Sequence, residues 1–251
     1  MSLKLTLAYD GTNYVGWQRQ SNGVSIQQVV EEALAPLAGG MTSVVGAGRT
    51  DAGVHALGQV ASANLESDHS AATIQRAMNA RLPADVRVTD AADAPLGFHA
   101  RFHAVGKTYR YRLVTGGFVS PFDRWFVWHA PGRRDVDAMH RAAAHLVGRH
   151  DFASFQAMGT PVRDTIRTIH RLEIADCEGE LVIDVDGDGF LRHMVRAIVG
   201  TLADVGAGAR SPESMADIVA ARTRAAAGDT APACGLTLVA VRYSIPSAKI
   251  P

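Results

Sequence analysis

Leu3-Lys-Leu-Thr-Leu7 opens the chain with a strict alternation of leucine and polar residues. A hydrophobic period of two predicts a β-strand that is buried on one face. Ser25 and Gln28 then form a capping-box pattern, which starts a helix with one apolar face. Gly39-Gly40 is expected to end that helix. The chain therefore begins with a strand followed by an amphipathic helix.

The elements expected next complete one structural unit. Hydrophobic periodicity predicts strands near 42–47 and 56–64, a helix near 71–79 and a strand near 86–89. The resulting order, strand–helix–strand–strand–helix–strand, is that of a ferredoxin-like unit.

The second half of the chain repeats this order of elements. The expected strands lie near 107–115, 166–176, 180–186 and 236–243, and the expected helices near 135–147, near 190–204 and from Ser211-Pro212. Gly116-Gly117 and the loop to about residue 134 break the periodicity, which is typical of a functional insertion. We predict an α+β fold of two ferredoxin-like units, residues 1–104 and 105–251, that share a mixed, mainly antiparallel sheet. Helices would cover one face of this sheet and leave the other face as a wide cleft.

Composition favours an ordinary globular protein. The 251 residues are 47% apolar and 20% charged. No apolar run reaches the roughly 18 residues needed to span a bilayer, and the N-terminus lacks a signal-peptide layout. Two cysteines without metal-site spacing are typical of reduced thiols. We therefore expect a soluble, cytoplasmic protein with no membrane partner.

The distribution of charge matters more than its sum, which is formally zero. Basic residues form three clusters, namely Arg101, His103, Lys107, Arg110 and Arg112, then Arg133, Arg134, Arg141, Arg149 and His150, and finally Arg163, Arg167, His170 and Arg171. The acidic residues concentrate elsewhere in the sequence. This separation favours a surface for a polyanion such as RNA.

Gly46-Ala-Gly-Arg49-Thr-Asp51-Ala-Gly53-Val-His55 is rich in residues that carry chemistry or unusual backbone geometry. Its glycines permit positive φ angles and close backbone contacts. Arg49 and Asp51 lie two residues apart, so both side chains point the same way if the segment is extended. The residues alone leave two interpretations open: a functional carboxylate, or a tight turn in which Asp51 bonds to its own backbone.

Arg49-Thr-Asp51-Ala-Gly-Val-His55 resembles the active-site motif of the TruA family of tRNA pseudouridine synthases. Other motifs of that family follow in order, namely Tyr9-Asp-Gly-Thr-Asn-Tyr-Val-Gly-Trp17-Gln, Phe98-His-Ala-Arg101-Phe, Lys107-Thr-Tyr109-Arg-Tyr111, His150-Asp-Phe-Ala-Ser-Phe155, Phe190-Leu-Arg-His-Met-Val-Arg196 and Gly235-Leu-Thr-Leu-Val-Ala-Val-Arg-Tyr243. The resemblance implies the same two-unit architecture, usually as a homodimer. It also implies an isomerase that converts uridine to pseudouridine at positions 38, 39 and 40 of the tRNA anticodon stem-loop.

The resemblance implies that Asp51 is the nucleophile. An aspartate in water is already ionised at neutral pH, so it needs no separate base. Arg196, expected in a helix with Arg192 one turn before it, would pair with Asp51 and orient it. The apolar neighbours of Arg196 indicate a partly buried setting, in which an arginine needs a partner such as a carboxylate.

Tyr109 and Arg49 are the predicted substrate-binding residues. Tyrosine on a strand usually packs in a core, and the residues alone favour that interpretation for Tyr109. The resemblance instead implies that its ring contacts the flipped-out base. Tyr111 is then expected to be a packing residue. Arg49 is placed to occupy the space that the extruded nucleotide vacates.

The predicted reaction needs no cofactor and no metal, and the sequence has no motif for either. Asp184-Val-Asp-Gly-Asp-Gly189 matches the start of a calcium-binding loop, but Val195 stands where that loop requires glutamate. His99 and His103 would not share a helical face, and His55 is expected to pack or to hydrogen-bond locally. The valine at position 195 therefore excludes a calcium site in this segment.

Two other functions fit parts of the sequence. A non-catalytic RNA-binding protein would explain the basic clusters and the tyrosines, but not a carboxylate in a site for a polyanion. An N-glycosidase would need a second carboxylate as general acid, which no motif supplies. Attack of Asp51 on C1′ of the sugar and on C6 of the base both stay open.

Overall fold

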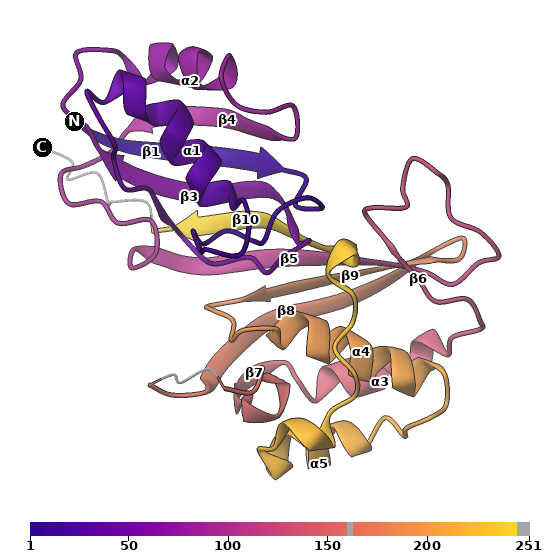
Figure 1. Ribbon diagram of the computed structural model, residues 1–251. Coiled ribbons are helices and arrows are strands. Elements are labelled where there is room, and N and C mark those ends of the chain that lie inside the picture. Colours follow the sequence, from indigo (N-terminus) through magenta and orange to yellow (C-terminus); the bar gives the residue numbers. More distant parts are fainter. Residues whose placement is uncertain (160–162, 245–251) are drawn as a thin grey trace, which may run out of the picture. The chain divides into compact units, whose positions relative to one another are not determined.

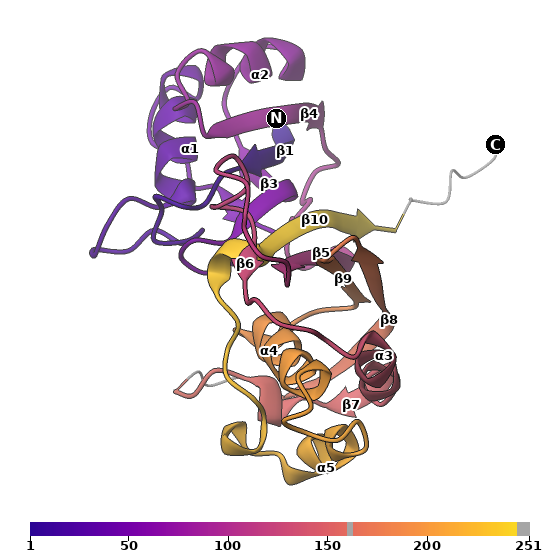
Figure 2. The same cartoon turned by 90° about the vertical axis from the view of Figure 1, so that its right-hand side faces the viewer.

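The computed structural model describes residues 1–159 and 163–244 (Figure 1, Figure 2). The chain divides into two compact units: Met1–Lys107 with the chain from Leu238 onward, and Thr108–Thr237. The chain passes between the units within strands β5 (Ala104–Val114) and β10 (Leu236–Tyr243). Most of β10 thus belongs to the first unit, whereas a single division at residue 104 assigns it to the second.

The first unit has the predicted order of strands and helices. Its elements are β1 (Ser2–Tyr9), α1 (Ile26–Leu34), β2 (Val45–Gly46), β3 (His55–Asn64), α2 (Ala71–Asn79) and β4 (Val86–Asp93). Strand β1 pairs antiparallel with β3 on one side and with β4 on the other. Strand β2 pairs antiparallel with β3, and the strand order is β4-β1-β3-β10. The prediction of a strand over 42–47 is correct in place but too long.

The core of the first unit forms where the leucines of β1 meet the apolar face of the helices. Leu3, Leu5 and Leu7 are fully buried, as their alternation predicts. Ile26 and Leu34 of α1 are fully buried as well. Helices α1 and α2 pack on each other, and α2 packs on β4 (Figure 1).

Helix α1 starts as predicted and ends earlier. The Ser25 hydroxyl accepts a hydrogen bond from the backbone N–H of Gln28 at 3.2 Å, which confirms the N-cap. The α-helix ends at Leu34 and continues only as a 3-10 turn, Ala35–Leu37. Pro36 explains the early end, because proline has no N–H to continue the helical hydrogen bonds. The prediction that Gly39-Gly40 ends the α-helix was wrong for this reason.

The second unit also combines strands with helices. Its elements are β5, β6 (Trp128–His129), α3 (Val136–Ala144), β7 (Gly148–Asp151), β8 (Ile166–Cys177), β9 (Glu180–Gly187), α4 (Met194–Gly206) and α5 (Ser214–Ala221). The strand order is β5-β9-β8-β7, and β6 pairs parallel with β5. Strands β7, β8 and β9 pair antiparallel. The short strands β6 and β7 were not predicted, because segments this short leave no periodic signal.

Helix α3 packs against both α4 and β8 in the second unit (Figure 2). Helix α4 begins at Met194 rather than near residue 190. His193, the residue before it, has a left-handed φ of 63°, which a continuous right-handed helix cannot contain. Arg192 therefore precedes the helix, and the prediction that it lies one helical turn before Arg196 was wrong.

The predicted α+β class with mainly antiparallel strand pairing is confirmed. Within residues 1–159 and 163–244, helices long and apolar enough to cross a bilayer are absent.

Candidate active-site residues

Asp51 lies in the loop that joins β2 to β3. This loop runs from Ala47 to Val54, and the backbone N–H of Val54 donates to the Asp51 carbonyl at 3.1 Å. The side chain of Asp51 is half-exposed, and that of Arg49 is exposed. The loop thus presents a carboxylate and a guanidinium two residues apart.

The segment between β1 and α1 holds the backbone of this loop. The N–H of Trp17 donates to the Thr50 carbonyl at 3.0 Å, and the N–H of Gly53 donates to the Tyr14 carbonyl at 3.4 Å. Gly16 has a φ of +100°, and a Cβ there would lie 2.6 Å from the Thr50 carbonyl oxygen. Only glycine permits both this φ and this approach. Two chain segments are therefore fixed against each other directly before Asp51.

Further glycines allow the same close packing around the loop. A Cβ on Gly11 would lie 2.0 Å from the carbonyl oxygen of Val54, and one on Gly46 would lie 2.5 Å from the indole of Trp17. The Trp17 side chain is only 2% exposed. A Cβ on Gly48 would lie 3.3 Å from Cε of Lys107, so the aliphatic part of the Lys107 side chain packs against the loop.

Buried hydrogen bonds support the loop from inside the first unit. The hydroxyls of Tyr9 and Thr50 are 2.9 Å apart, and the Gln59 amide donates to the Gly48 carbonyl at 2.8 Å. Burial raises the pKa of Tyr9 to about 12, an effect that its hydrogen bonds to Thr50 and Gln59 only partly oppose. The Tyr9 hydroxyl therefore stays neutral at physiological pH and can act as donor and acceptor.

His55 is buried, as expected of a packing residue, but its hydrogen bond to Gly11 is not local, because the two residues lie 44 positions apart. Its ring is 3% exposed, and Nδ1 accepts a hydrogen bond from the backbone N–H of Gly11 at 3.1 Å. A carboxylate oxygen of Asp10 lies 3.1 Å from the same nitrogen. Since one ring nitrogen cannot accept from Gly11 and donate to Asp10 at once, the tautomer decides which contact forms.

Arg49 is held by a side chain that was not predicted. Its Nε donates to Oε1 of Gln18 at 3.2 Å. Gln18 belongs to the motif that begins at Tyr9, but its sequence position suggested no role. A glutamine directly after the buried Trp17, with glycines close by, was the signal that could have identified it.

Tyr109 lies on β5 in the second unit. Its side chain is 7% exposed, and its ring packs edge-to-face on Phe190, with centroids 5.2 Å apart and planes at 84°. Tyr111 is fully buried, and its hydroxyl donates to the Pro232 carbonyl at 2.8 Å. The packing role predicted for Tyr111 is confirmed.

Arg196 lies in the first turn of α4 and is half-buried. Its Nε donates to the Ala231 carbonyl at 2.7 Å, and the backbone N–H of Ala231 donates back to the Arg196 carbonyl at 3.1 Å. These two hydrogen bonds hold Arg196 against the segment that leads to β10.

Several of the arginines in the predicted basic clusters are paired with acids. Arg110 forms a two-pronged bond with Asp184, both at 2.8 Å, and Arg112 contacts Glu180 and Asp123. Arg167 pairs with Asp164 and Arg171 with Glu173. The expectation that acids lie apart from these clusters was wrong. The pairing of β5 with β9 brings Asp184 and Glu180 to their arginines, whereas Asp164 and Glu173 already lie beside theirs in the sequence.

Within the part of the chain that the structure describes, no group of three or more metal-ligating side chains gathers. A hollow of about 510 Å³ in the second unit is lined by Arg149, Asp164, Ile166, Arg167, Thr168, Asp188 and Gly189. None of the four predicted site residues lines it. Those four fall into two pairs: Arg49 and Asp51 belong to the first unit, Tyr109 and Arg196 to the second.

Comparison with known proteins finds relatives that cover nearly the whole chain. The profile of the family described as "tRNA pseudouridine synthase" matches residues 6–103 and 142–244. A protein of Syntrophotalea carbinolica named tRNA pseudouridine synthase A is 50% identical over 242 residues, covering 96% of each chain. One of the same name from Geobacter sulfurreducens is 47% identical and covers 96% of this chain and 99% of its own. A Cbf5-Nop10-Gar1 complex contains a chain that is 13% identical, with a TM-score of 0.38, covering 80% of this chain and 45% of that one.

Proposed function

The chain belongs to the tRNA pseudouridine synthase family, and we propose on that premise that it isomerises uridines 38, 39 and 40 of the tRNA anticodon stem-loop. Pseudouridine synthases are isomerases. The reaction breaks the bond between C1′ and N1 of uridine and forms one between C1′ and C5. The C5 proton leaves to solvent and N1 takes up a proton, so atoms and electrons balance without a cofactor.

The carboxylate of Asp51 is the proposed nucleophile. The observation that carries this role is its position: a half-exposed aspartate directly follows Thr50, whose carbonyl and hydroxyl are both hydrogen-bonded to buried partners. A backbone fixed in this way limits the orientations of the carboxylate before substrate binds, which is the basis of catalytic preorganisation. Attack on C1′ and addition to C6 are both compatible with this position.

Arg196 is proposed to pair with the Asp51 carboxylate and keep it oriented. Its Nε donates to the Ala231 carbonyl, which restricts the orientation of the Arg196 side chain. A guanidinium suits this role because its fork of donors matches a carboxylate. Tyr109 is proposed to contact the extruded base, a role that its edge-to-face packing on Phe190 supports by orienting the ring.

Arg49 is proposed to occupy the space that the extruded uridine leaves. Its side chain is exposed and lies two residues before the proposed nucleophile, which supports a contact of this cation with the phosphates that flank the target. Contacts of this kind help to offset the few kcal/mol that unstacking a base costs.

We further propose that the enzyme acts in the cytoplasm as a homodimer, because a tRNA is large compared with one chain of 251 residues. Sedimentation equilibrium at micromolar concentration tests the dimer. A single protein chain in the free state, and a single protein chain in the complex with tRNA, would contradict the proposed dimer.

A non-catalytic RNA-binding protein is the competing proposal. A carboxylate in a site for phosphates weakens binding through charge repulsion, so a binding protein has no use for Asp51. Replacement of Asp51 by alanine would then improve RNA binding or leave it unchanged, whereas it abolishes turnover if Asp51 is catalytic.

Mapping of pseudouridine in defined transcripts tests the proposed specificity. Unmodified tRNA with a single uridine at position 38, 39 or 40 should each gain one pseudouridine, detected by mass spectrometry of nuclease fragments. A transcript with cytidine at all three positions is the matched control and should gain none. Modification of the control, or of none of the transcripts, would contradict the proposed sites.

A further inference from the structure

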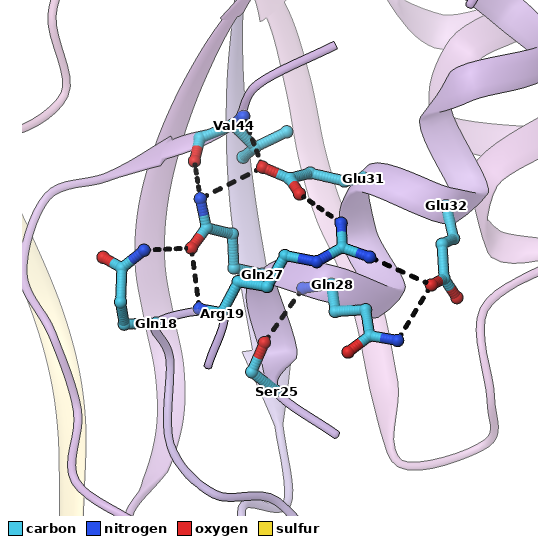
Figure 3. Close-up of polar contacts among 8 residues, drawn as sticks. All are labelled: Gln18, Arg19, Ser25, Gln27, Gln28, Glu31, Glu32 and Val44. Carbon is cyan, nitrogen blue, oxygen red and sulfur yellow. Dashed lines mark hydrogen bonds and ion pairs between the residues drawn. The ribbon is translucent and has the colours of Figure 1, made fainter. Parts of the chain in front are cut away.

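Glu31 is an almost fully buried carboxylate on α1, far in sequence from the Asp51 loop. Only 6% of the residue is exposed. One oxygen accepts from the Gln27 amide at 3.0 Å and from the backbone N–H of Val44 at 3.1 Å. The other accepts from the guanidinium of Arg19 at 3.1 Å. Figure 3 shows these partners converging on the carboxylate.

The bonds of Glu31 fix which way the Gln27 amide faces. A carboxylate and the Val44 carbonyl only accept hydrogen bonds, so the amide nitrogen of Gln27 must face them, at 3.0 Å each. Its oxygen therefore faces the opposite way. There it accepts from the Gln18 amide at 2.7 Å and from the backbone N–H of Arg19 at 2.9 Å (Figure 3).

The orientation of Gln27 in turn fixes that of Gln18. Because the Gln18 amide nitrogen donates to Gln27, the Gln18 oxygen is left as an acceptor, and Nε of Arg49 donates to it at 3.2 Å. Arginine is always a donor, so the chain has a single consistent polarity from one end to the other. The buried anion of Glu31 thus determines that an acceptor faces Arg49.

We propose that Gln18 is a positioning residue for Arg49, and that Glu31 sets its orientation through Gln27. This inference rests on the proposed function, in which Arg49 acts beside Asp51. Among the described residues, Gln18 is the one partner of the Arg49 side chain, and it binds Nε only. Because the anchor uses Nε, both terminal nitrogens of the guanidinium keep their donors for phosphate or base oxygens of the RNA.

Replacing Gln18 should disturb the position of Arg49 without disrupting the fold. Gln18 is half-buried, and its removal leaves the Gln27 oxygen still bonded to the backbone N–H of Arg19. Gln18→Leu keeps the approximate size of the side chain, so we expect the fold to survive. What the variant removes is the acceptor for Arg49.

A double-mutant cycle on the full chain tests the proposal. Gln18→Leu, Arg49→Ala and the double variant are compared with wild type in single-turnover tritium release from tRNA labelled at uracil C5, with saturating enzyme. Filter binding gives the dissociation constant of each protein for tRNA. Gln28→Leu is the matched control, because Gln28 lies on α1 next to Gln27 but bonds to exposed Glu32, at 2.9 Å, and not to Gln27 or Arg49.

We expect Gln18→Leu to slow tritium release from the enzyme–tRNA complex about tenfold. A rate loss of this size is typical of losing a hydrogen bond to a charged group. We expect less than a twofold change for Gln28→Leu, in rate and in melting temperature. In the Arg49→Ala background, Gln18→Leu should change the rate less than twofold, because its partner is already absent.

Three results would overturn the proposal: a wild-type rate for Gln18→Leu, a wild-type rate for Arg49→Ala, or equal and additive effects in both backgrounds. Each is distinct from failure of the proposed function, which would appear as absence of tritium release from the wild-type protein itself.

Discussion

The backbone N–H of Trp17 donates to the carbonyl of Thr50 at 3.0 Å, and this bond joins the segment after β1 to the loop that carries Asp51. Gly16, the residue before Trp17, makes the contact possible because a side chain there would collide with the same carbonyl. The position of the proposed nucleophile thus depends on a residue 35 positions earlier in the sequence.

Gly16→Ala should destabilise the first unit and slow the reaction. A Cβ would lie 2.6 Å from the Thr50 oxygen, and the φ of +100° is itself unfavourable for alanine. Gly39→Ala is the control, because Gly39 also has a positive φ, +71°, but no atom within 4 Å of its Cβ position. We expect Gly16→Ala to lower the free energy of unfolding by about 2 kcal/mol more than Gly39→Ala. Urea titration measures this difference, and equal losses would contradict the role of the close contact.

Glu31→Gln should lower the free energy of unfolding by about 2–3 kcal/mol. The carboxylate accepts from Arg19, Gln27 and Val44, and an amide in its place turns one acceptor into a donor that faces other donors. Glu32→Gln, next to it but exposed, should change stability by less than about 0.5 kcal/mol. Urea unfolding of both variants checks the contrast. Similar losses of unfolding free energy for the two variants would contradict a larger contribution from the buried hydrogen bonds of Glu31.

Stability should fall as the pH rises from about 10 to about 12. Burial raises the folded-state pKa of Tyr9 to about 12, above its ordinary value of 10.0, so the folded protein holds this proton more tightly than the unfolded chain does. The stabilisation is fully present below pH 10 and is lost as the pH passes through the folded pKa, with a slope of at most about 1.4 kcal/mol per pH unit.

Tyr9→Phe isolates this contribution. The variant should show a shallower loss of stability between pH 10 and 12 in thermal melts. The raised pKa values of buried Tyr111 and half-buried Tyr243 retain part of the pH dependence of stability. An identical slope in wild type and variant would exclude Tyr9 as a source.

Arg196→Lys should reduce the rate of pseudouridine formation about a hundredfold with little change in tRNA affinity. Lysine keeps the positive charge but lacks the Nε that bonds the Ala231 carbonyl and the planar fork that pairs with a carboxylate. Arg192→Lys is the control, because Arg192 is exposed and precedes α4; its rate should stay within twofold of wild type. Single-turnover kinetics compare them, and equal rates for the two variants would contradict the role of Arg196.

The sequence predicts the larger elements well because their signals are local. Leucine alternation places β1, and the Ser25 cap and apolar spacing place α1. Helix α4 starts late because the left-handed φ of His193 arises from the tertiary path of the chain, which no local pattern encodes. The ion pair of Arg110 with Asp184 was missed for a similar reason, since its partners lie 74 residues apart.

The site shows the same division between local and distant information. Asp51 and Arg49 stand out by residue type within a glycine-rich segment. The residues that hold them do not stand out, because Gln18, Tyr9 and Gln59 come from other parts of the first unit and reach the loop by hydrogen bonds that only the fold creates. Residue type identifies chemical groups, whereas their orientation depends on contacts that only the fold creates.

Tritium release from tRNA labelled at uracil C5 distinguishes a nucleophilic Asp51 from a structural one, when wild type is compared with Asp51→Asn and no cofactor is added. The asparagine keeps the size of the side chain and removes the charge. We expect release by wild type and none by Asp51→Asn, although the variant binds tRNA at least as tightly. Release by Asp51→Asn at the wild-type rate would contradict the assignment of Asp51 as nucleophile.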